Sequence, residues 1–468
     1  MPASSDPAFL PIAMLSEEFE ARRLDPLAVT CLMLGRIEAH NQALNAYLTV
    51  CAATAIAEAA EASARAAAGR RRGVLDGVPI SLKDNIDVAG VPTSNGFAQS
   101  EKLPPWRVPR EDAEVVRRLR AAGAVMLGKL NMHEGALGAT NDNPHFGATI
   151  NPHRPGFTPG GSSGGSGAAI AAGLCTAALG SDTGGSVRIP ASYCGAVGFK
   201  PSFGLVSTRG VVPLSWRLDH VGPLARTVEE ARIMFEALRG FDPACPESRR
   251  SGAEEPVPAA IDGLRLGVLR NFDDEPVEPA ARATFAEALH VFERLGCTVQ
   301  PLELASYDRV RARRAALLRI EADAAAIHAD LYQREPERFS PAIRLYLDYG
   351  ARALATQLAR AERLIDVAAA ELARAFDEVD AILAPTAPQP AFAFGADPPK
   401  NQNAFCILAN FAGVPAVSLP MGKTEEGLPL GLQIMTARDR DALALHLAQA
   451  YERAAGWRLD PPPPFGPA

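Results

Sequence analysis

Serines embedded in glycine are the residues whose type and spacing best suit chemistry. Ser162 lies in the run GGSSGGSG at residues 160–167, and Ser186 lies in a second cluster, GGS, at residues 184–186. Glycine is costly inside helices and strands, and it is used where the backbone needs positive φ or a close approach to another group. Exposed backbone N–H groups in such loops can stabilise a developing oxyanion. The two clusters therefore favour acyl transfer by a nucleophilic serine.

Positioning these serines requires that the two loops meet. An alanine-rich apolar run at residues 168–179 joins the clusters and is typical of a helix. A short β-like run flanked by turn residues, at 73–85, contains Lys83, and an expected buried strand at 124–127 precedes a loop that carries Lys129. A buried lysine can serve as a base, so both lysines are candidates.

Two other interpretations of the glycine-serine runs are weaker. A phosphate-binding P-loop needs a lysine directly after its second glycine, and Ser166 stands there. The segment 160–164 matches G-x-S-x-G, the nucleophile elbow of α/β-hydrolases, with Ser162 as nucleophile. That mechanism needs a later histidine, and no HGGG-type motif precedes the elbow; the later histidines are His220, His290, His328 and His446.

His133-Glu134 does not extend to the zinc motif H-E-x-x-H, because residue 137 is leucine.

The third interpretation combines a serine nucleophile with a lysine base that acts through a second serine. Lys83 in G-x-P-x-x-x-K-D-N, Ser162 in GGSSGGS and Ser186 in D-T-G-G-S-V-R, 24 residues after Ser162, together resemble the amidase signature family. The resemblance runs over residues 76–230 and returns at 380–388 and 408–434. Three motifs in this order are far more specific than any one of them.

The resemblance implies a role for each of these residues. Ser186 would attack the carbonyl carbon, and Ser162, held by a cis peptide bond in this family, would relay the proton to Lys83. Lys83 must be uncharged to accept a proton, which requires burial, because a free lysine has a pKa of about 10.4. The oxyanion hole would consist of backbone N–H groups of Thr183, Gly184, Gly185 and Ser186.

Other residues of these motifs are expected to support the site. Asp182 and Arg188 flank the nucleophile in an apolar stretch, so we expect them to pair and brace the loop. Ser163 is expected to hydrogen-bond within its cluster. Lys129 lies outside the matching motif and is assigned a structural role.

The family includes general amidases and the glutamine-hydrolysing component of the tRNA-dependent amidotransferase, known as its A subunit. That component carries an acidic residue, which recognises the glutamine amino group, shortly before an N-L-A-G-x-P motif. Asn403 stands at the comparable position here, and a neutral amide cannot supply that charge.

We therefore predict an amidase that hydrolyses the C–N bond of a small or aryl amide, with carbamates and ureas as related substrates. The alternative is the glutamine-hydrolysing component of the amidotransferase. No cofactor or metal is implied. The pocket is expected to come from residues 238–403 and the 132–146 loop, with these lining candidates: Met132, Phe146, Tyr193, Trp216 and Ile343.

Composition excludes several classes of protein. The 468 residues carry a net charge of −7, which favours neither nucleic acid nor an anionic membrane as partner. Seven cysteines without C-x-x-C spacing and the lack of a recognisable secretory signal favour a cytoplasmic protein. The sequence leaves open whether the protein forms a homodimer.

The pattern of elements predicts one large α/β domain whose central sheet is mixed, mostly parallel and twisted, with helices on both faces. Strands are also expected at 380–385 and 415–420, and a capped helix at 227–238. The predicted organisation is an N-terminal helical layer (1–72), a catalytic core (73–235), a variable helical region that shapes the pocket (236–400) and C-terminal strands with a helix that complete the core (401–468).

Overall fold

An 11-stranded sheet runs through the protein in the computed structural model, which describes residues 6–252, 256–457, 459 and 461–466. The strands are β1 (Tyr47–Val50), β2 (Pro79–Lys83), β3 (Val125–Leu130), β4 (Ala177–Asp182), β5 (Val197–Lys200), β6 (His220–Ala225), β7 (Arg265–Leu269), β8 (Thr298–Leu302), β9 (Ala381–Pro385), β10 (Ala416–Lys423) and β11 (Pro429–Thr436).

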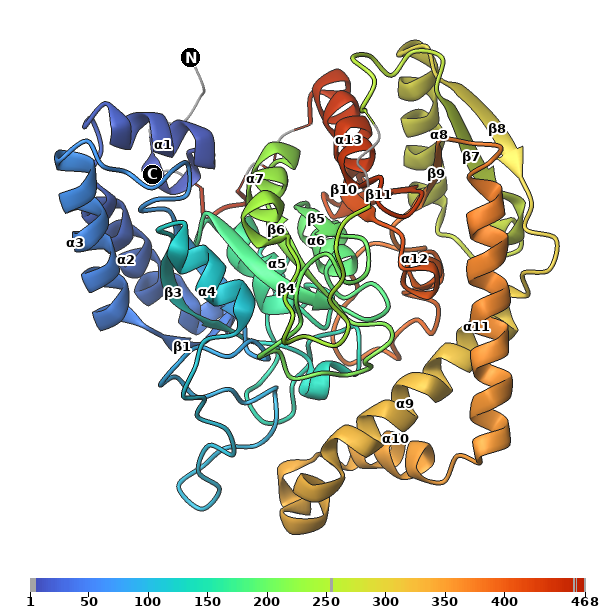
Figure 1. Ribbon diagram of the computed structural model, residues 1–468, viewed down its shortest axis with the longest axis horizontal. Coiled ribbons are helices and arrows are strands. Elements are labelled where there is room, and N and C mark those ends of the chain that lie inside the picture. Colours follow the sequence, from blue (N-terminus) through green and yellow to red (C-terminus); the bar gives the residue numbers. More distant parts are fainter. Residues whose placement is uncertain (1–5, 253–255, 458, 460, 467–468) are drawn as a thin grey trace.

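Helices cover both faces of this sheet, as the α/β prediction required (Figure 1). They are α1 (Ile12–Glu20), α2 (Pro26–Leu44), α3 (Ala52–Ala67), α4 (Glu114–Ala121), α5 (Gly164–Ala171), α6 (Arg188–Cys194), α7 (Val228–Leu238), α8 (Pro279–Arg294), α9 (Arg309–Arg334), α10 (Pro341–Ala351), α11 (Ala355–Ala375), α12 (Ile407–Ala412) and α13 (Asp441–Ala455). Single 3₁₀ turns are η1 (Pro7–Phe9), η2 (Glu134–Ala136), η3 (Arg270–Phe272) and η4 (Pro336–Arg338).

The sheet is mixed, but the expectation that it is mostly parallel is wrong. Its order is β1-β3-β2-β4-β6-β5-β10-β11-β9-β7-β8. Four neighbouring pairs are parallel, β2–β3, β2–β4, β7–β8 and β7–β9, and the other six are antiparallel. The antiparallel pairs dominate the centre because β10 and β11 form a hairpin that pairs with β5 on one side and β9 on the other.

Side chains alternate between the two faces of the sheet along each strand, and this divides the hydrophobic core into two parts. On β3, Met126 packs in one hydrophobic cluster with residues of α4 and α7, whereas Val125 and Leu127 pack in another with residues of α2, α3 and α5. Successive side chains of a strand point to opposite faces, so a strand buried on both faces is apolar throughout. Lys83 is therefore directed to the same face as Ser81, which contacts Tyr47 just after α2.

Several sequence-based boundaries need correction. The N-terminal layer 1–72, expected to be helical, contains the edge strand β1 between α2 and α3. The apolar run 168–179 is not one helix, because it ends α5 and then enters β4. β3 continues beyond residue 127 to Leu130, so Lys129 lies in the strand; Gly128 permits this, since a Cβ there would lie 2.2 Å from the Thr49 carbonyl oxygen.

Other predicted elements are confirmed. β2 ends at Lys83, and β9 and β10 occupy the two proline-flanked runs. Helix α7 begins with a capping box in which the Thr227 side chain accepts from the Glu230 backbone and the Glu230 carboxylate accepts from the Thr227 N–H. Beyond the sheet, α9 packs against α10 and α11, and Figure 1 shows α9 and α10 extending below the core.

Candidate active site

Lys83 and Ser162 are in direct contact. The Lys83 Nζ lies 2.7 Å from Ser162 Oγ and 2.8 Å from Ser181 Oγ. Lys83 ends β2 and Ser181 lies near the end of β4, and the carboxyl ends of these parallel neighbours meet at one edge of the sheet. The side chains of both Lys83 and Ser162 are fully buried.

Ser162 lies shortly before α5, and the Gly161–Ser162 peptide bond is cis. Close packing requires glycine before Ser162, because a Cβ on Gly161 would lie 2.8 Å from the Ala139 carbonyl carbon. Ser163 contributes within the cluster as expected, because its hydroxyl donates to the Ser181 carbonyl oxygen at 3.2 Å.

Ser186 lies in the loop between β4 and α6, beside the other serine cluster. The Ser163 N–H donates to the Ser186 carbonyl oxygen at 3.3 Å, which ties the two loops together. Ser186 is partly exposed and lines a cavity of about 460 Å³. Its hydroxyl forms no hydrogen bond with the described part of the chain, so it is free to face a substrate.

The loop before Ser186 offers three backbone donors to the cavity, and this corrects the expected set of four. Gly185 N–H is already bonded to the Asp182 carboxylate at 2.7 Å. Within the described residues, the N–H groups of Thr183, Gly184 and Ser186 have no protein acceptor, and all three residues line the cavity. Unpaired donors of this kind suit an oxyanion.

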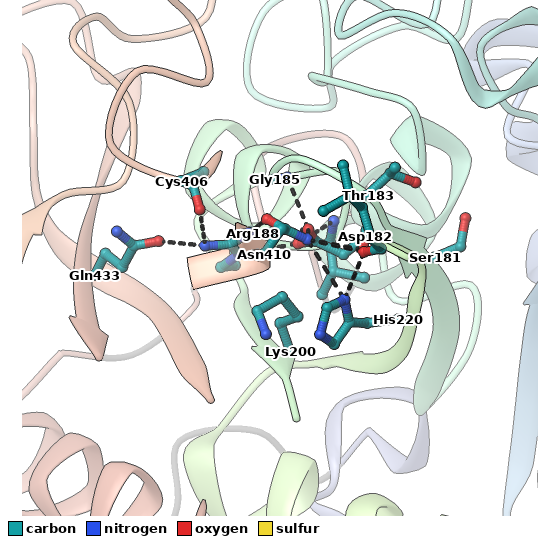
Figure 2. Close-up of polar contacts among 12 residues, drawn as sticks. Ser181, Asp182, Thr183, Gly185, Arg188, Lys200, His220, Cys406, Asn410 and Gln433 are labelled. Atoms are coloured by element: carbon teal, nitrogen blue, oxygen red, sulfur yellow. Dashed lines mark hydrogen bonds and ion pairs between the residues drawn. The ribbon is translucent and has the colours of Figure 1, made fainter. Parts of the chain in front are cut away.

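Asp182 and Arg188 form the expected ion pair at 2.9 Å, and both side chains are fully buried (Figure 2). All five guanidinium N–H groups are used, by both Asp182 carboxylate oxygens, the Cys406 carbonyl, Gln433 and Asn410. Asp182 also accepts from the N–H groups of Gly185 and Val187. Burial alone would raise the pKa of Asp182, but the Arg188 charge holds this pKa well below its usual value. The pair thus braces the loop that carries Ser186.

We expect Gly185→Ala to lower kcat by about 10²- to 10³-fold, because it moves the loop that presents the oxyanion donors. Gly185 has φ +122°, and a Cβ there would lie 2.8 Å from the Cys406 Cβ. Gly184→Ala is the matched control, since its Cβ would meet nothing closer than 3.4 Å and should cost less than about tenfold. Steady-state kinetics of the two variants test this, and equal losses would contradict it.

No histidine replaces the lysine in this arrangement. Within the described residues, no histidine ring contacts the hydroxyl of Ser162 or Ser186. The ring of His133 interacts electrostatically with Lys83, but its Nδ1 contacts the Thr140 hydroxyl. Burial lowers the pKa of His133 to about 4. His220 contacts the Leu218 carbonyl instead, and His328 packs against Phe97. The nucleophile-elbow interpretation is therefore wrong for this geometry.

Burial lowers the pKa of Lys83 to about 7, although the charges of Asp219 and Asp182 act to raise it. No carboxylate in the described chain forms an ion pair with this amine. A lowered pKa of this kind lets the Lys83 amine lose its proton near neutral pH, which is what a general base requires.

The pH profile should follow this group. Because the uncharged amine is the active form and its fraction rises with pH, kcat/KM for a non-ionising amide should increase about tenfold per pH unit below pH 7 and level off above it. The unfolding temperature measured over the same range serves as the control for stability. A rate that falls as pH rises through 7 would contradict this assignment of Lys83.

Sequence reasoning missed several polar groups around Lys83. Asn85 Nδ2 donates to Ser181 Oγ at 3.1 Å, and Thr183 Oγ1 donates to Asp219 at 2.6 Å. Burial raises the pKa of Asp219 to about 6. Asn85 ends the motif of Lys83 and Ser181 directly precedes the motif of Ser186, so their positions were a usable signal. Asp219 lies in an irregular segment outside these motifs.

Lys129 has the structural role assigned to it. Its Nζ lies 2.9 Å from Asp84 Oδ1 and 3.2 Å from Thr93 Oγ1, and both ends of the ion pair are buried. The amine is thus held away from the serines.

The cavity at Ser186 lies between the segment 136–139, the loop of Ser186, helix α9 and the segment 399–403, and none of the five expected lining residues contributes to it. Met132, Tyr193 and Ile343 are core residues, with Tyr193 bonded to Gln389. Phe146 lies near Asn45, and Trp216 borders a separate cavity of about 210 Å³. The walls are built by other residues, chiefly Leu137, Gly138, Ile189, Arg313, Leu317, Ile320, Glu321, Tyr346, Gln402 and Asn403.

Comparison with known proteins identifies the family. The Amidase family model matches residues 28–445, which is most of the chain. The chain belongs to the amidase signature family. Within the described residues, no helix has both the length and the apolar character that crossing a membrane would need.

Curated members of the family with whole-length similarity include the A subunit of glutamyl-tRNA(Gln) amidotransferase from Thermosynechococcus vestitus, 36% identical over 93% of this chain and 95% of that protein. Seven further proteins of this name are 32–38% identical. Their name associates them with a tRNA, so these relatives do not support the expectation that nucleic acid plays no part.

Solved structures of the family include proteins that are named for other activities. A chain from a vestigial protein complex that reveals the evolutionary origins of an s-triazine catabolic enzyme superposes with a TM-score of 0.89 at 34% identity, over 96% of this chain and 99% of that one. A bacterial aryl acylamidase superposes with a TM-score of 0.89 at 27% identity, over 96% and 97%. The chain is thus an amidase signature enzyme that acts on C–N bonds.

Proposed function

We propose that the protein hydrolyses the C–N bond of a small or aryl amide through an acyl-enzyme on Ser186. The observation that carries this proposal is the 2.7 Å contact between the buried Lys83 amine and Ser162 Oγ, beside the loop of Ser186. Carbamates and ureas present the same carbonyl geometry and are related substrates.

In the proposed mechanism, Ser186 Oγ attacks the carbonyl carbon while its proton passes to Ser162, whose own proton passes to neutral Lys83. The N–H groups of Thr183, Gly184 and Ser186 stabilise the oxyanion. The Lys83 ammonium then returns the proton through Ser162 to the leaving nitrogen, and the C–N bond breaks. Water attacks the resulting ester by the same relay, which releases the carboxylate and restores Ser186.

The second candidate function is glutamine hydrolysis within a tRNA-dependent amidotransferase. The curated relatives favour this candidate more strongly than the first, because they carry that name. Asn403 favours the first candidate. It lines the cavity, and its Nδ2 lies 3.4 Å from the position of a Cβ on Gly184, so a neutral amide stands close to the oxyanion loop.

Ammonia or amine release from a neutral aryl amide and from L-glutamine tests the proposal, with Ser186→Ala as the inactive variant. We expect turnover of the aryl amide that Ser186→Ala abolishes. Turnover of glutamine alone would favour the amidotransferase function. Equal rates for wild type and Ser186→Ala would remove Ser186 from its role.

A further inference from the structure

A second cavity, of about 210 Å³, comes within one side chain of Lys83, and we call it the Trp216 cavity. Ser181 lines it, and Ser181 Oγ lies 2.8 Å from the Lys83 amine. Among the described residues, Leu214 is the only one that lines both this cavity and the Ser186 cavity. The two cavities are therefore neighbours whose walls are otherwise built by different residues.

Asn85 contributes an unpaired acceptor to the Trp216 cavity. The residue is 1% exposed and belongs to the lining. Its Nδ2 donates to Ser181 Oγ at 3.1 Å and to the Val212 carbonyl oxygen at 3.4 Å, which fixes the orientation of the amide, because a carbonyl oxygen can only accept. The acceptor Oδ1 is buried and has no hydrogen-bond partner in the described chain. A buried acceptor without a donor is costly, so it needs an explanation.

His220 contributes a second acceptor of the same kind. It is 4% exposed and lines the cavity from the first position of β6. Its Nδ1 lies 2.7 Å from the Leu218 carbonyl oxygen, closer than the Asn410 amide at 3.5 Å, so Nδ1 carries the proton and Nε2 is an acceptor. Burial holds the pKa of His220 well below its usual value, which keeps the ring neutral. Within the described residues, Nε2 has no hydrogen-bond partner.

The charges of the lining favour a cation. Arg209 lines the cavity, but its charge is offset by ion pairs with Glu114 and Asp242. The lining carboxylates belong to Asp219 and Glu247, and neither forms an ion pair with any residue that the structure describes. Burial raises the pKa of Asp219 to about 6, so this carboxyl group is mostly ionised above pH 7. The lining thus carries negative charge that its own arginine does not neutralise.

We propose that the Trp216 cavity is a second binding site, for a small organic ammonium ion whose N–H groups donate to Asn85 Oδ1 and His220 Nε2. A primary ammonium has three donors and no acceptor, which matches a site where both unpaired atoms accept. Trp216 is 44% exposed in the lining, and the face of an indole ring attracts organic cations. Because Ser186 does not line this cavity, the ion would bind beside Lys83 as a ligand separate from the substrate.

Isothermal titration calorimetry with n-butylammonium chloride tests the site. We expect saturable binding of n-butylammonium to the wild type. Binding of n-butyltrimethylammonium, which has the same charge but no N–H donor, should be about tenfold weaker or less, and butyrate should not bind. Equal affinities for the two cations, or no binding of n-butylammonium, would overturn the proposal.

Variants locate the site on the chain. His220→Phe keeps an aromatic ring against Phe203 but removes the Nε2 acceptor, and it should weaken n-butylammonium binding about tenfold or more. His446→Phe is the matched control, because His446 Nε2 is also buried without a partner among the described residues but lies outside this lining. Trp216→Leu, at an exposed position, should weaken binding about two- to fivefold even if His220→Phe does not fold, whereas Trp457→Leu should not. Unchanged binding in Trp216→Leu and in a folded His220→Phe would overturn the site.

Ser186→Ala separates this proposal from the proposed function. The variant is expected to lose hydrolysis but to bind n-butylammonium with the affinity of the wild type, because Ser186 lies outside the Trp216 cavity. Hydrolysis that persists in Ser186→Ala would contradict the proposed function and leave the binding site standing. Weaker n-butylammonium binding in Ser186→Ala would place the ion in the Ser186 cavity and overturn the second site.

Discussion

Lys83→Met is expected to lower kcat/KM for every amide substrate by about 10²- to 10⁴-fold. The substitution keeps much of the buried apolar stem but removes the amine that lies 2.7 Å from Ser162 Oγ. Without a proton acceptor, neither Ser162 nor Ser186 can give up its proton at neutral pH. Single-turnover kinetics with an aryl amide would measure the loss in the acylation step.

Two controls separate this effect from misfolding and from simple loss of charge. Lys129→Met removes another buried lysine from the adjacent strand and should reduce stability, because Asp84 loses its partner, while the folded fraction keeps its acylation rate. Lys83→Arg keeps the charge but cannot become neutral in the working range, so it should be as inactive as Lys83→Met. Substantial activity in Lys83→Arg would contradict a neutral base.

Arg188→Met is expected to give the largest loss of stability, about 3–5 kcal/mol in the free energy of unfolding. The variant leaves the Asp182 carboxylate buried without its countercharge and leaves Asn410, Gln433 and the Cys406 carbonyl with unsatisfied oxygens. Chemical denaturation monitored by circular dichroism would measure the change.

Arg232→Met is the matched control for that experiment. Arg232 pairs with Glu229 on the surface of α7, and exposed pairs contribute at most about 1 kcal/mol. Similar losses for the two variants would contradict the importance of the buried pair. A folded, stable Arg188→Met protein with normal acylation would contradict the role assigned to Arg188 in bracing the Ser186 loop.

The sequence identified the groups that meet at the centre of the site because they lie in dense local motifs. Lys83, Ser162, Asp182 and Arg188 each stand beside glycines or turn residues whose spacing is unusual, and the contacts Lys83–Ser162 and Asp182–Arg188 are present. The partners of Arg188 could not be predicted in the same way. Gln433 and Asn410 are more than 200 residues away in the chain and become neighbours only when β11 and α12 pack beside α6.

The substrate cavity was the least predictable part. Aromatic residues such as Tyr193 and apolar residues such as Met132 were expected to line it, but residues of this kind are more often core, and the sheet buries both. Helix α9 supplies a wall through Arg313 and Glu321, whose helical spacing is ordinary. That neither forms an ion pair within the described part of the chain is visible only in three dimensions. Likewise, the excess of antiparallel strand pairs depends on β11, a strand that the sequence pattern did not reveal.

The most direct test of the proton relay is the site and rate of fluorophosphonate labelling in wild type and Ser162→Ala, with the modified peptide identified by mass spectrometry. We predict a single adduct on Ser186 in wild type, forming faster as pH rises through about 7, and strongly slowed labelling in Ser162→Ala. An adduct on Ser162, or unchanged labelling of Ser186 in Ser162→Ala, would contradict the transfer of the proton from Ser186 through Ser162 to Lys83.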